Sequence, residues 1–156
     1  MYMLEKDVKY IVLHCSATRS NQAYTVEQLT RDHQARGFRT VGYHFYIRQD
    51  GSVTQHRKLL EAGAHAMGYN HCSIGICYEG GLDVNGNPCD TRTEAQKRGL
   101  LDLFIILSKM FPEAKVVGHC ELPHVHKACP CIDMETWRKE LAAHVKHFKF
   151  AKDCCR

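Results

Sequence analysis

Val8-Lys-Tyr-Ile-Val-Leu13 is an apolar, β-branched run of strand length, which predicts a buried strand at the centre of a sheet. His14 follows this run directly, and His119 follows a second short run, Lys115-Val-Val-Gly118, in the same way. In sheets that are covered by helices, ligands gather at the carboxyl ends of the strands. We therefore expect both histidines to lie at that edge of the sheet.

A cysteine that follows the second histidine completes a candidate metal site. His14, His119 and Cys129, the last within Lys127-Ala-Cys-Pro130, offer two imidazoles and a thiolate. Zn²⁺ binds such groups readily, and a catalytic zinc site leaves its fourth position open to water. A structural site would need four ligands and Cys-x-x-Cys pairs, which this chain lacks. With 11 His and 9 Cys in 156 residues, chance placement is the alternative on spacing alone.

Length, charge and cysteine content limit the classes of protein to which this chain can belong. A chain of 156 residues with 44% hydrophobic content predicts a single domain over residues 1–156, with a catalytic core at about 8–148 and a basic tail at 149–156. The net charge of +4 favours anionic surfaces without requiring them. The first residues lack a signal-peptide pattern and no long apolar segment occurs, so we expect synthesis in the cytoplasm without a signal peptide and no membrane insertion. Nine cysteines, an odd number, predict reduced thiols.

Periodicity and turn signals place the remaining elements. Two capping boxes of the form Thr-x-x-Gln begin predicted helices, and Asp133 can cap a third. The predicted helices run over residues 25–37, 93–111 and 133–145, and the predicted strands over residues 8–13, 41–48, 52–56, 73–79 and 115–118. This order predicts an α/β fold: a single domain with a central mixed β-sheet of about five strands, flanked by about three helices.

Alternation along the predicted strand at 41–48 assigns side chains to its two faces. Tyr43 would share a face with Phe45, and His44 would point to the opposite face and be structural. From the strand pattern alone, Tyr43 is interpreted as a core aromatic residue.

Short motifs fall in one order along residues 8–138. They are His14-Cys-Ser-Ala-Thr18, Val41-Gly-Tyr-His-Phe45, Asp50-Gly51, His65-Ala-Met-Gly-Tyr-Asn-His71, Ser73-Ile-Gly-Ile-Cys77, Gly80-Gly81, Gly118-His119 and Lys127-Ala-Cys-Pro130. Together they resemble the zinc-dependent N-acetylmuramoyl-L-alanine amidases of type 2, the family that includes amidase-type bacteriophage lysozymes and shares its fold with peptidoglycan recognition proteins. The resemblance implies hydrolysis of the amide bond between N-acetylmuramic acid and the L-alanine of peptidoglycan.

The resemblance also implies one Zn²⁺ per chain, held by His14, His119 and Cys129. The chain departs from the phage-type pattern because nine residues, and not seven, separate His119 from Cys129. His124 and His126 lie in this longer loop and are alternative ligands.

Further site residues are implied by position in the family motifs. Tyr43 and Lys127 match the catalytic groups, which would stabilise the developing oxyanion or transfer a proton. His65, Asn70 and His71 match the segment that contacts substrate. A solvated loop tip is the alternative interpretation of that segment.

Other functions stay open at this point. A cysteine-nucleophile peptidoglycan hydrolase would use Cys15 or Cys120, and Cys131 could replace Cys129 as a ligand. A non-catalytic module would bind peptidoglycan or muropeptides without cleaving them. A zinc protein that binds nucleic acid would need a concentrated basic face or paired Cys-x-x-Cys motifs. We expect peptidoglycan or muropeptides as the partner, no nucleic acid, and a monomer.

Overall fold

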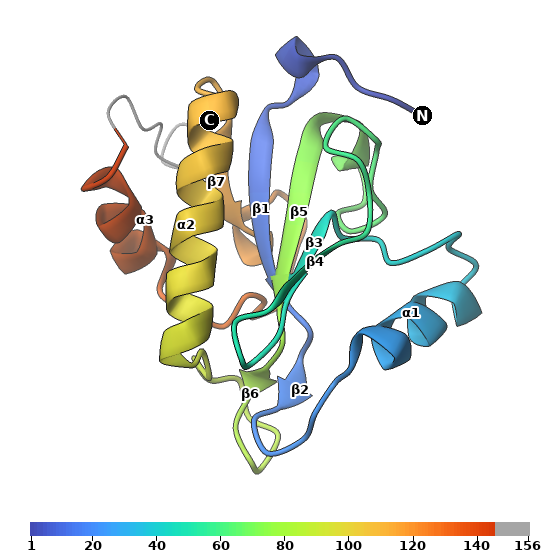
Figure 1. Cartoon of the computed structure of the whole chain (residues 1–156), viewed down its shortest axis with the longest axis vertical. Coiled ribbons are helices and arrows are strands. Elements are labelled where there is room, and N and C mark those ends of the chain that lie inside the picture. Colours follow the sequence, from blue (N-terminus) through green and yellow to red (C-terminus); the bar gives the residue numbers. More distant parts are fainter. Residues whose placement is uncertain (146–156) are drawn as a thin grey trace.

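A five-stranded mixed sheet forms the centre of the computed structural model, which describes residues 1–145 (Figure 1). Its strands are β1 (Tyr10–Cys15), β3 (Phe45–Ile47), β4 (Val53–Gln55), β5 (Ser73–Tyr78) and β7 (Lys115–Gly118), in the order β4-β3-β5-β1-β7. All neighbouring strands are parallel except β3 and β4, which form the predicted hairpin. The mixed sheet confirms the predicted fold class.

The first strand is buried on both faces, as its unbroken apolar run predicts. Ile11, Val12 and Leu13 are each fully buried. Ile11 and Leu13 pack into the main core, whereas Val12 packs into a second cluster with Val117 on the other side of the sheet. Burying a side chain of this size stabilises a fold by about 1.5–3 kcal/mol. The strand therefore anchors His14, its fifth residue.

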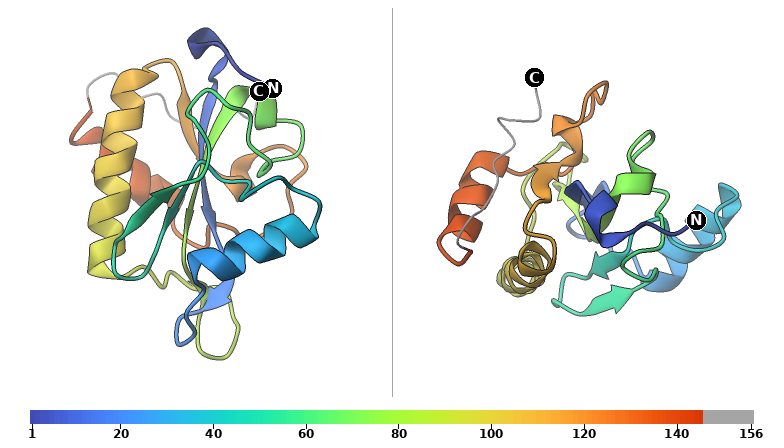
Figure 2. Two further views of the ribbon diagram at one scale, coloured as in Figure 1. Left: turned by 45° about the vertical axis from the view of Figure 1, so that its right-hand side comes forward. Right: turned by 90° about the horizontal axis from the view of Figure 1, so that it is seen from above.

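Two helices cover one face of the sheet and a third covers the other (Figure 2). The first pair is α2 (Glu94–Met110) and α3 (Met134–Ala142), which meet where the Phe104 and Trp137 rings pack edge to face, 5.5 Å apart. Helix α1 (Val26–Ala35) packs against the opposite face through Leu29. None of the helices within residues 1–145 is long and apolar enough to cross a membrane.

The predicted helix starts are confirmed atom by atom. The Thr25 hydroxyl accepts from the backbone N–H of Gln28, and the Gln28 side chain accepts from the backbone N–H of Thr25. Thr93 and Gln96 form the same reciprocal pair. Asp133 accepts from two backbone N–H groups at the start of α3. These caps satisfy N–H groups that the first turn of a helix leaves without partners.

Short elements complete the described chain. A small parallel pair joins β2 (Thr18–Arg19) to β6 (Gly81–Leu82), and 3-10 turns lie at Glu5–Asp7, Asn70–Cys72 and His119–Glu121. The predicted loop at 83–90 is confirmed apart from an isolated bridge at Pro88. The predicted basic tail at 149–156 lies outside the described residues.

The prediction for residues 41–44 is wrong. The strand forms only over Phe45–Ile47, and Tyr43 packs with Tyr46 on the α1 side of the sheet, not with Phe45. The cause is a close approach of backbones at Gly42, where a Cβ atom would lie 2.1 Å from the carbonyl oxygen of Ala64. This contact bends the segment, so strand alternation does not reach Tyr43.

His44 has the structural role that the sequence predicts. Its Nδ1 accepts from the Gly75 N–H at 3.0 Å, and its Nε2 lies 2.6 Å from the Glu61 carbonyl oxygen. Burial lowers the pKa of His44 to about 4, so the ring is neutral at pH 7.

Candidate metal centre and active site

The candidate site is a cleft of about 630 Å³ at the carboxyl end of β1. Its walls come from the end of β1, the C-terminal part of α1, the segment 64–70 and the loop 119–129. Among the described residues that line it there is no Asp or Glu, whereas Arg36 and Lys127 are both present. The cleft therefore has a basic lining, which suits an anionic ligand.

Strand register brings the two predicted histidine ligands together. Strands β1 and β7 are parallel, and Leu13 pairs with Gly118. The next residue of each chain segment is a histidine, so His14 and His119 lie side by side with ring centroids 4.5 Å apart. Their meeting follows from the pairing of two buried strands.

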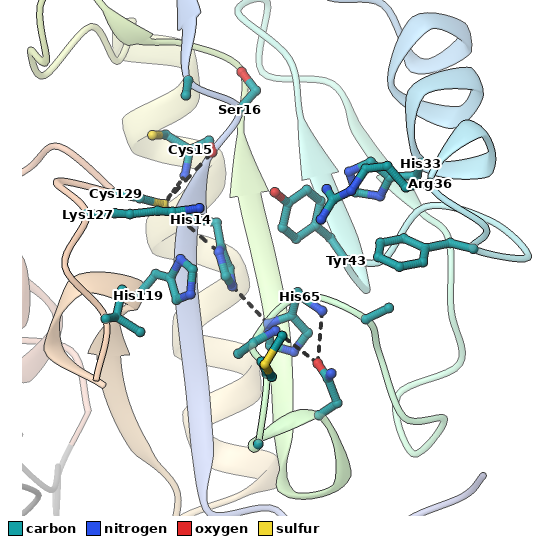
Figure 3. Close-up of a pocket in the computed structure, with 18 of the residues that line it drawn as sticks. His14, Cys15, Ser16, His33, Arg36, Tyr43, His65, His119, Lys127 and Cys129 are labelled. Carbon is teal, nitrogen blue, oxygen red and sulfur yellow. Dashed lines mark hydrogen bonds between the residues drawn. The ribbon is translucent and has the colours of Figure 1, made fainter. Parts of the chain in front are cut away.

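Cys129 completes a group of three possible metal ligands (Figure 3). The ligand atoms of His14, His119 and Cys129 all lie within 4.8 Å of one another, and no other such group occurs among residues 1–145. The Cys129 sulfur lies 4.0 Å from His14 Nδ1 and accepts from the Cys15 N–H at 3.3 Å. Two imidazoles and one sulfur fit Zn²⁺, and three protein ligands leave a position open.

The longer loop does not add a ligand to this group. His124 and His126 line the cleft but lie outside the three-residue group. Cys131 also lies outside it, and its sulfur contacts that of Cys15 at 3.8 Å.

Burial keeps the histidines of the site in the form that binds metal. Desolvation, followed by the charges of neighbouring histidines, lowers the pKa of His14 well below its usual value, and desolvation does the same for His65. Burial, and then the charge of Lys127, lowers the pKa of His119. Neutral imidazole is the ligand form, so these nitrogens are available at neutral pH.

The two residues predicted to be catalytic lie around the ligands. Tyr43 faces His14 across the cleft, with ring centroids 5.0 Å apart (Figure 3). Burial, and then the neighbouring Cys77, raise the pKa of Tyr43 well above 10, so its phenol keeps its proton at neutral pH. Lys127 lines the cleft near His119, whose pKa it lowers.

Two of the three residues predicted to contact substrate line the cleft. His65 and Asn70 do so, whereas His71 is exposed and is not part of the lining. Asn70 Oδ1 accepts from the backbone N–H groups of His65 and Ala66, both at 2.9 Å, and so shapes this wall.

The opposite wall was missed by the sequence interpretation. It contains His33, Arg36 and Phe38, at and beyond the end of α1. His33 Nδ1 accepts from the Gly42 N–H at 2.8 Å, which ties α1 to the segment that carries Tyr43. The available signal was the predicted helix end at Gly37, which turns the chain back toward residues 41–44.

The environment of the cysteines does not favour a thiol nucleophile. A hydrogen bond to Cys129 and burial raise the pKa of Cys15, and its thiol contacts Cys131. Burial also raises the pKa of Cys120, which is not part of the cleft lining. A nucleophilic cysteine needs a stabilised thiolate, and neither site supplies one.

Comparison with known proteins gives a consistent result. The family model described as N-acetylmuramoyl-L-alanine amidase matches residues 4–132. The endolysin of Escherichia phage T7 is 39% identical over 127 residues, which cover 81% of this chain and 83% of the phage protein. The N-acetylmuramoyl-L-alanine amidase LysC from Clostridium intestinale URNW superposes with a TM-score of 0.71 at 26% identity, covering 88% of this chain and 84% of LysC. Drosophila PGRP-LB shares the fold, with a TM-score of 0.67 at 23% identity and coverage of 91% and 83%.

Proposed function

The chain belongs to the N-acetylmuramoyl-L-alanine amidase family, and on this premise we propose that it cleaves the amide bond between N-acetylmuramic acid and L-alanine in a zinc-dependent reaction. It is a peptidoglycan amidase. The observation that carries the zinc proposal is the convergence of His14, His119 and Cys129 within 4.8 Å on the cleft. When bound there, Zn²⁺ would supply the Lewis acidity that activates water and polarises a carbonyl group.

The protein's own groups supply the remaining chemistry. Tyr43 keeps its proton because burial raises its pKa, so its hydroxyl can donate to the carbonyl oxygen of the scissile amide. Lys127 brings a positive charge to the same cleft, where it stabilises negative charge that develops on that oxygen. Both act on the transition state, and neither is needed to complete the metal ligands.

The basic lining supports a substrate with an acidic peptide. Arg36 on one wall and Lys127 on the other face a cleft whose described lining has no carboxylate. A peptidoglycan stem peptide carries free carboxylates, which such a cleft attracts. His65, Asn70 and His71 remain proposed substrate contacts. A monomer that acts on cell-wall peptidoglycan or soluble muropeptides, without nucleic acid or membrane insertion, is part of the same proposal.

Two alternative functions are less well supported. A binding-only module needs no metal ligands, yet this chain presents all three together. A cysteine-nucleophile hydrolase needs a thiolate, yet the pKa values of Cys15 and Cys120 are raised.

Product analysis tests the proposed bond. Incubation of the purified protein with peptidoglycan should release free L-alanine amino termini without new reducing sugars, and a chelator should stop the release. Cys129→Ser should be inactive, whereas Cys15→Ala should retain substantial activity. New reducing ends, or chelator-resistant cleavage that Cys15→Ala abolishes, would contradict the proposal.

A further inference from the structure

We propose that His65 is a positioning residue that, together with Ser73, holds His14 in the tautomer with its proton on Nε2, so that Nδ1 is free to bind the metal. The inference rests on the proposed metal site and adds a function for a side chain outside the ligand set. Figure 3 shows the His65 side chain next to that of His14, with a dashed line for the hydrogen bond that joins them.

A continuous chain of hydrogen bonds carries the proposal. The Ser73 hydroxyl lies 2.7 Å from the carbonyl oxygen of Tyr69, which can only accept, so the hydroxyl donates there. Ser73 Oγ is then an acceptor for the N–H at His65 Nε2, 3.1 Å away. A neutral imidazole has one N–H, so His65 Nδ1 carries a lone pair.

The hydrogen bond to His65 also decides which ring nitrogen of His14 carries the proton. His65 Nδ1 lies 2.8 Å from His14 Nε2, which must therefore be the protonated nitrogen. The lone pair of His14 is left on Nδ1, the nitrogen that lies 4.0 Å from the Cys129 sulfur. The reverse arrangement would place a proton on His14 Nδ1 and leave no lone pair toward the other two ligands. Only one donor-to-acceptor direction along this series of hydrogen bonds is therefore compatible with metal binding at Nδ1.

The surroundings of His65 are shaped to hold its ring in place. A Cβ atom at Gly75 would lie 2.5 Å from the ring, and one at Gly63 would lie 2.7 Å from it, so both glycines leave space that the imidazole fills. Asn70 fixes the backbone at His65 by accepting its N–H at 2.9 Å. Ser73 is fully buried, so water does not compete for its hydroxyl.

Both ring nitrogens of His65 are engaged by the protein, so this positioning function does not depend on a bound substrate. Nδ1 faces His14 and Nε2 faces Ser73. Hydrogen bonds of this kind to a ligand histidine set its tautomer and orientation, and their loss typically lowers metal affinity about 10–100-fold.

The direct test is long-range ¹H–¹⁵N NMR of the imidazole nitrogens in the zinc-loaded protein. We expect His14 to be protonated at Nε2 and metal-bound at Nδ1, and His65 to be protonated at Nε2. Metal-bound Nε2 in His14, or a proton on Nδ1 of His65, would overturn the proposal.

Zinc affinity, measured by competition with a chelating dye, is the second readout. His65→Leu should weaken zinc binding about 10–100-fold, and Ser73→Ala should weaken it less. His65→Asn keeps a polar atom near the Nδ1 position and should recover part of the loss. The matched control is His44→Asn, which alters a neighbouring buried histidine that bonds only to backbone groups and should keep wild-type affinity.

The outcomes separate this inference from the proposed function. Wild-type affinity in His65→Leu, in a protein that binds zinc and cleaves peptidoglycan, would overturn the inference alone. Cleavage by metal-free wild-type protein would overturn the proposed function. If His65→Leu does not fold, the NMR assignment and Ser73→Ala still decide the inference.

Discussion

Arg138 on α3 forms an ion pair with Glu121, with Nη1 and Oε2 2.8 Å apart. The same carboxylate oxygen accepts from the backbone N–H of Gly118 at 2.8 Å, across the turn that begins with His119. Helix α3 therefore supports the turn that carries His119, a proposed metal ligand.

Removing this support should cost stability. Arg138→Ala leaves Glu121 without its charged partner, and we expect unfolding in urea to become easier by about 1–3 kcal/mol. Lys139→Ala is the matched control, because its pair with Glu135 is exposed and 3.9 Å long; it should change stability by about 0.5 kcal/mol or less. Equal losses in the two variants would show that the Glu121 contact does not support the turn.

Tyr43→Phe and Lys127→Ala should slow turnover and leave metal binding intact. Each removes one group that acts on the transition state, so kcat should fall by roughly one to three decades. Zinc content, measured by elemental analysis of the same preparations, should match that of the wild type. Undiminished turnover in both variants would remove these residues from the mechanism.

Arg36→Ala should raise KM for peptidoglycan fragments more than it lowers kcat, because Arg36 lines the cleft but does not belong to the metal group. Fragments with amidated carboxyl groups should lose this sensitivity if the guanidinium attracts carboxylates. Arg31→Ala, within α1 but outside the cleft lining, is the control. A KM unchanged by Arg36→Ala would argue against this wall as a binding surface.

Stability should fall as the pH is lowered from about 6.5 toward 4. Burial lowers the pKa values of both His33 and His44 to about 4 in the folded protein, whereas an unfolded histidine titrates near 6.5. Between these values the unfolded chain binds more protons than the folded one, so the free energy of unfolding decreases with falling pH.

The measurement is urea denaturation of metal-free protein at several pH values, since metal binding has its own pH dependence. The double variant His33→Asn, His44→Asn should lose stability less steeply over the same range. A slope identical to that of the wild type would show that these rings are not the source.

Local signals predicted much of the architecture because the responsible contacts are close in sequence. The capping boxes at Thr25 and Thr93 close within four residues, and the apolar run that becomes β1 needs no partner to be recognised. The position of Tyr43 was not predictable in this way. It depends on the approach of Gly42 to Ala64, which no periodicity encodes.

In the site, too, some features could be predicted from the sequence and others could not. Strand ends and motif resemblance predicted His14, His119 and Cys129 as a candidate ligand group, and the structure brings these residues together. The hydrogen bond between His14 and His65 joins residues 51 positions apart in the chain. Which ring nitrogens it joins depends on how the two rings are oriented. Such contacts become visible only when distant segments are folded against each other.

Zinc titration of the metal-free protein, with peptidoglycan cleavage as the readout, decides whether activity depends on one metal ion per chain. We expect no activity without metal, and activity that rises in proportion to added zinc and reaches its plateau at one equivalent per chain. Cys129→Ser should require a large excess of zinc or stay inactive. Full activity in the metal-free protein, or a plateau reached by Cys129→Ser at one equivalent, would contradict the assignment of His14, His119 and Cys129 as the catalytic metal site.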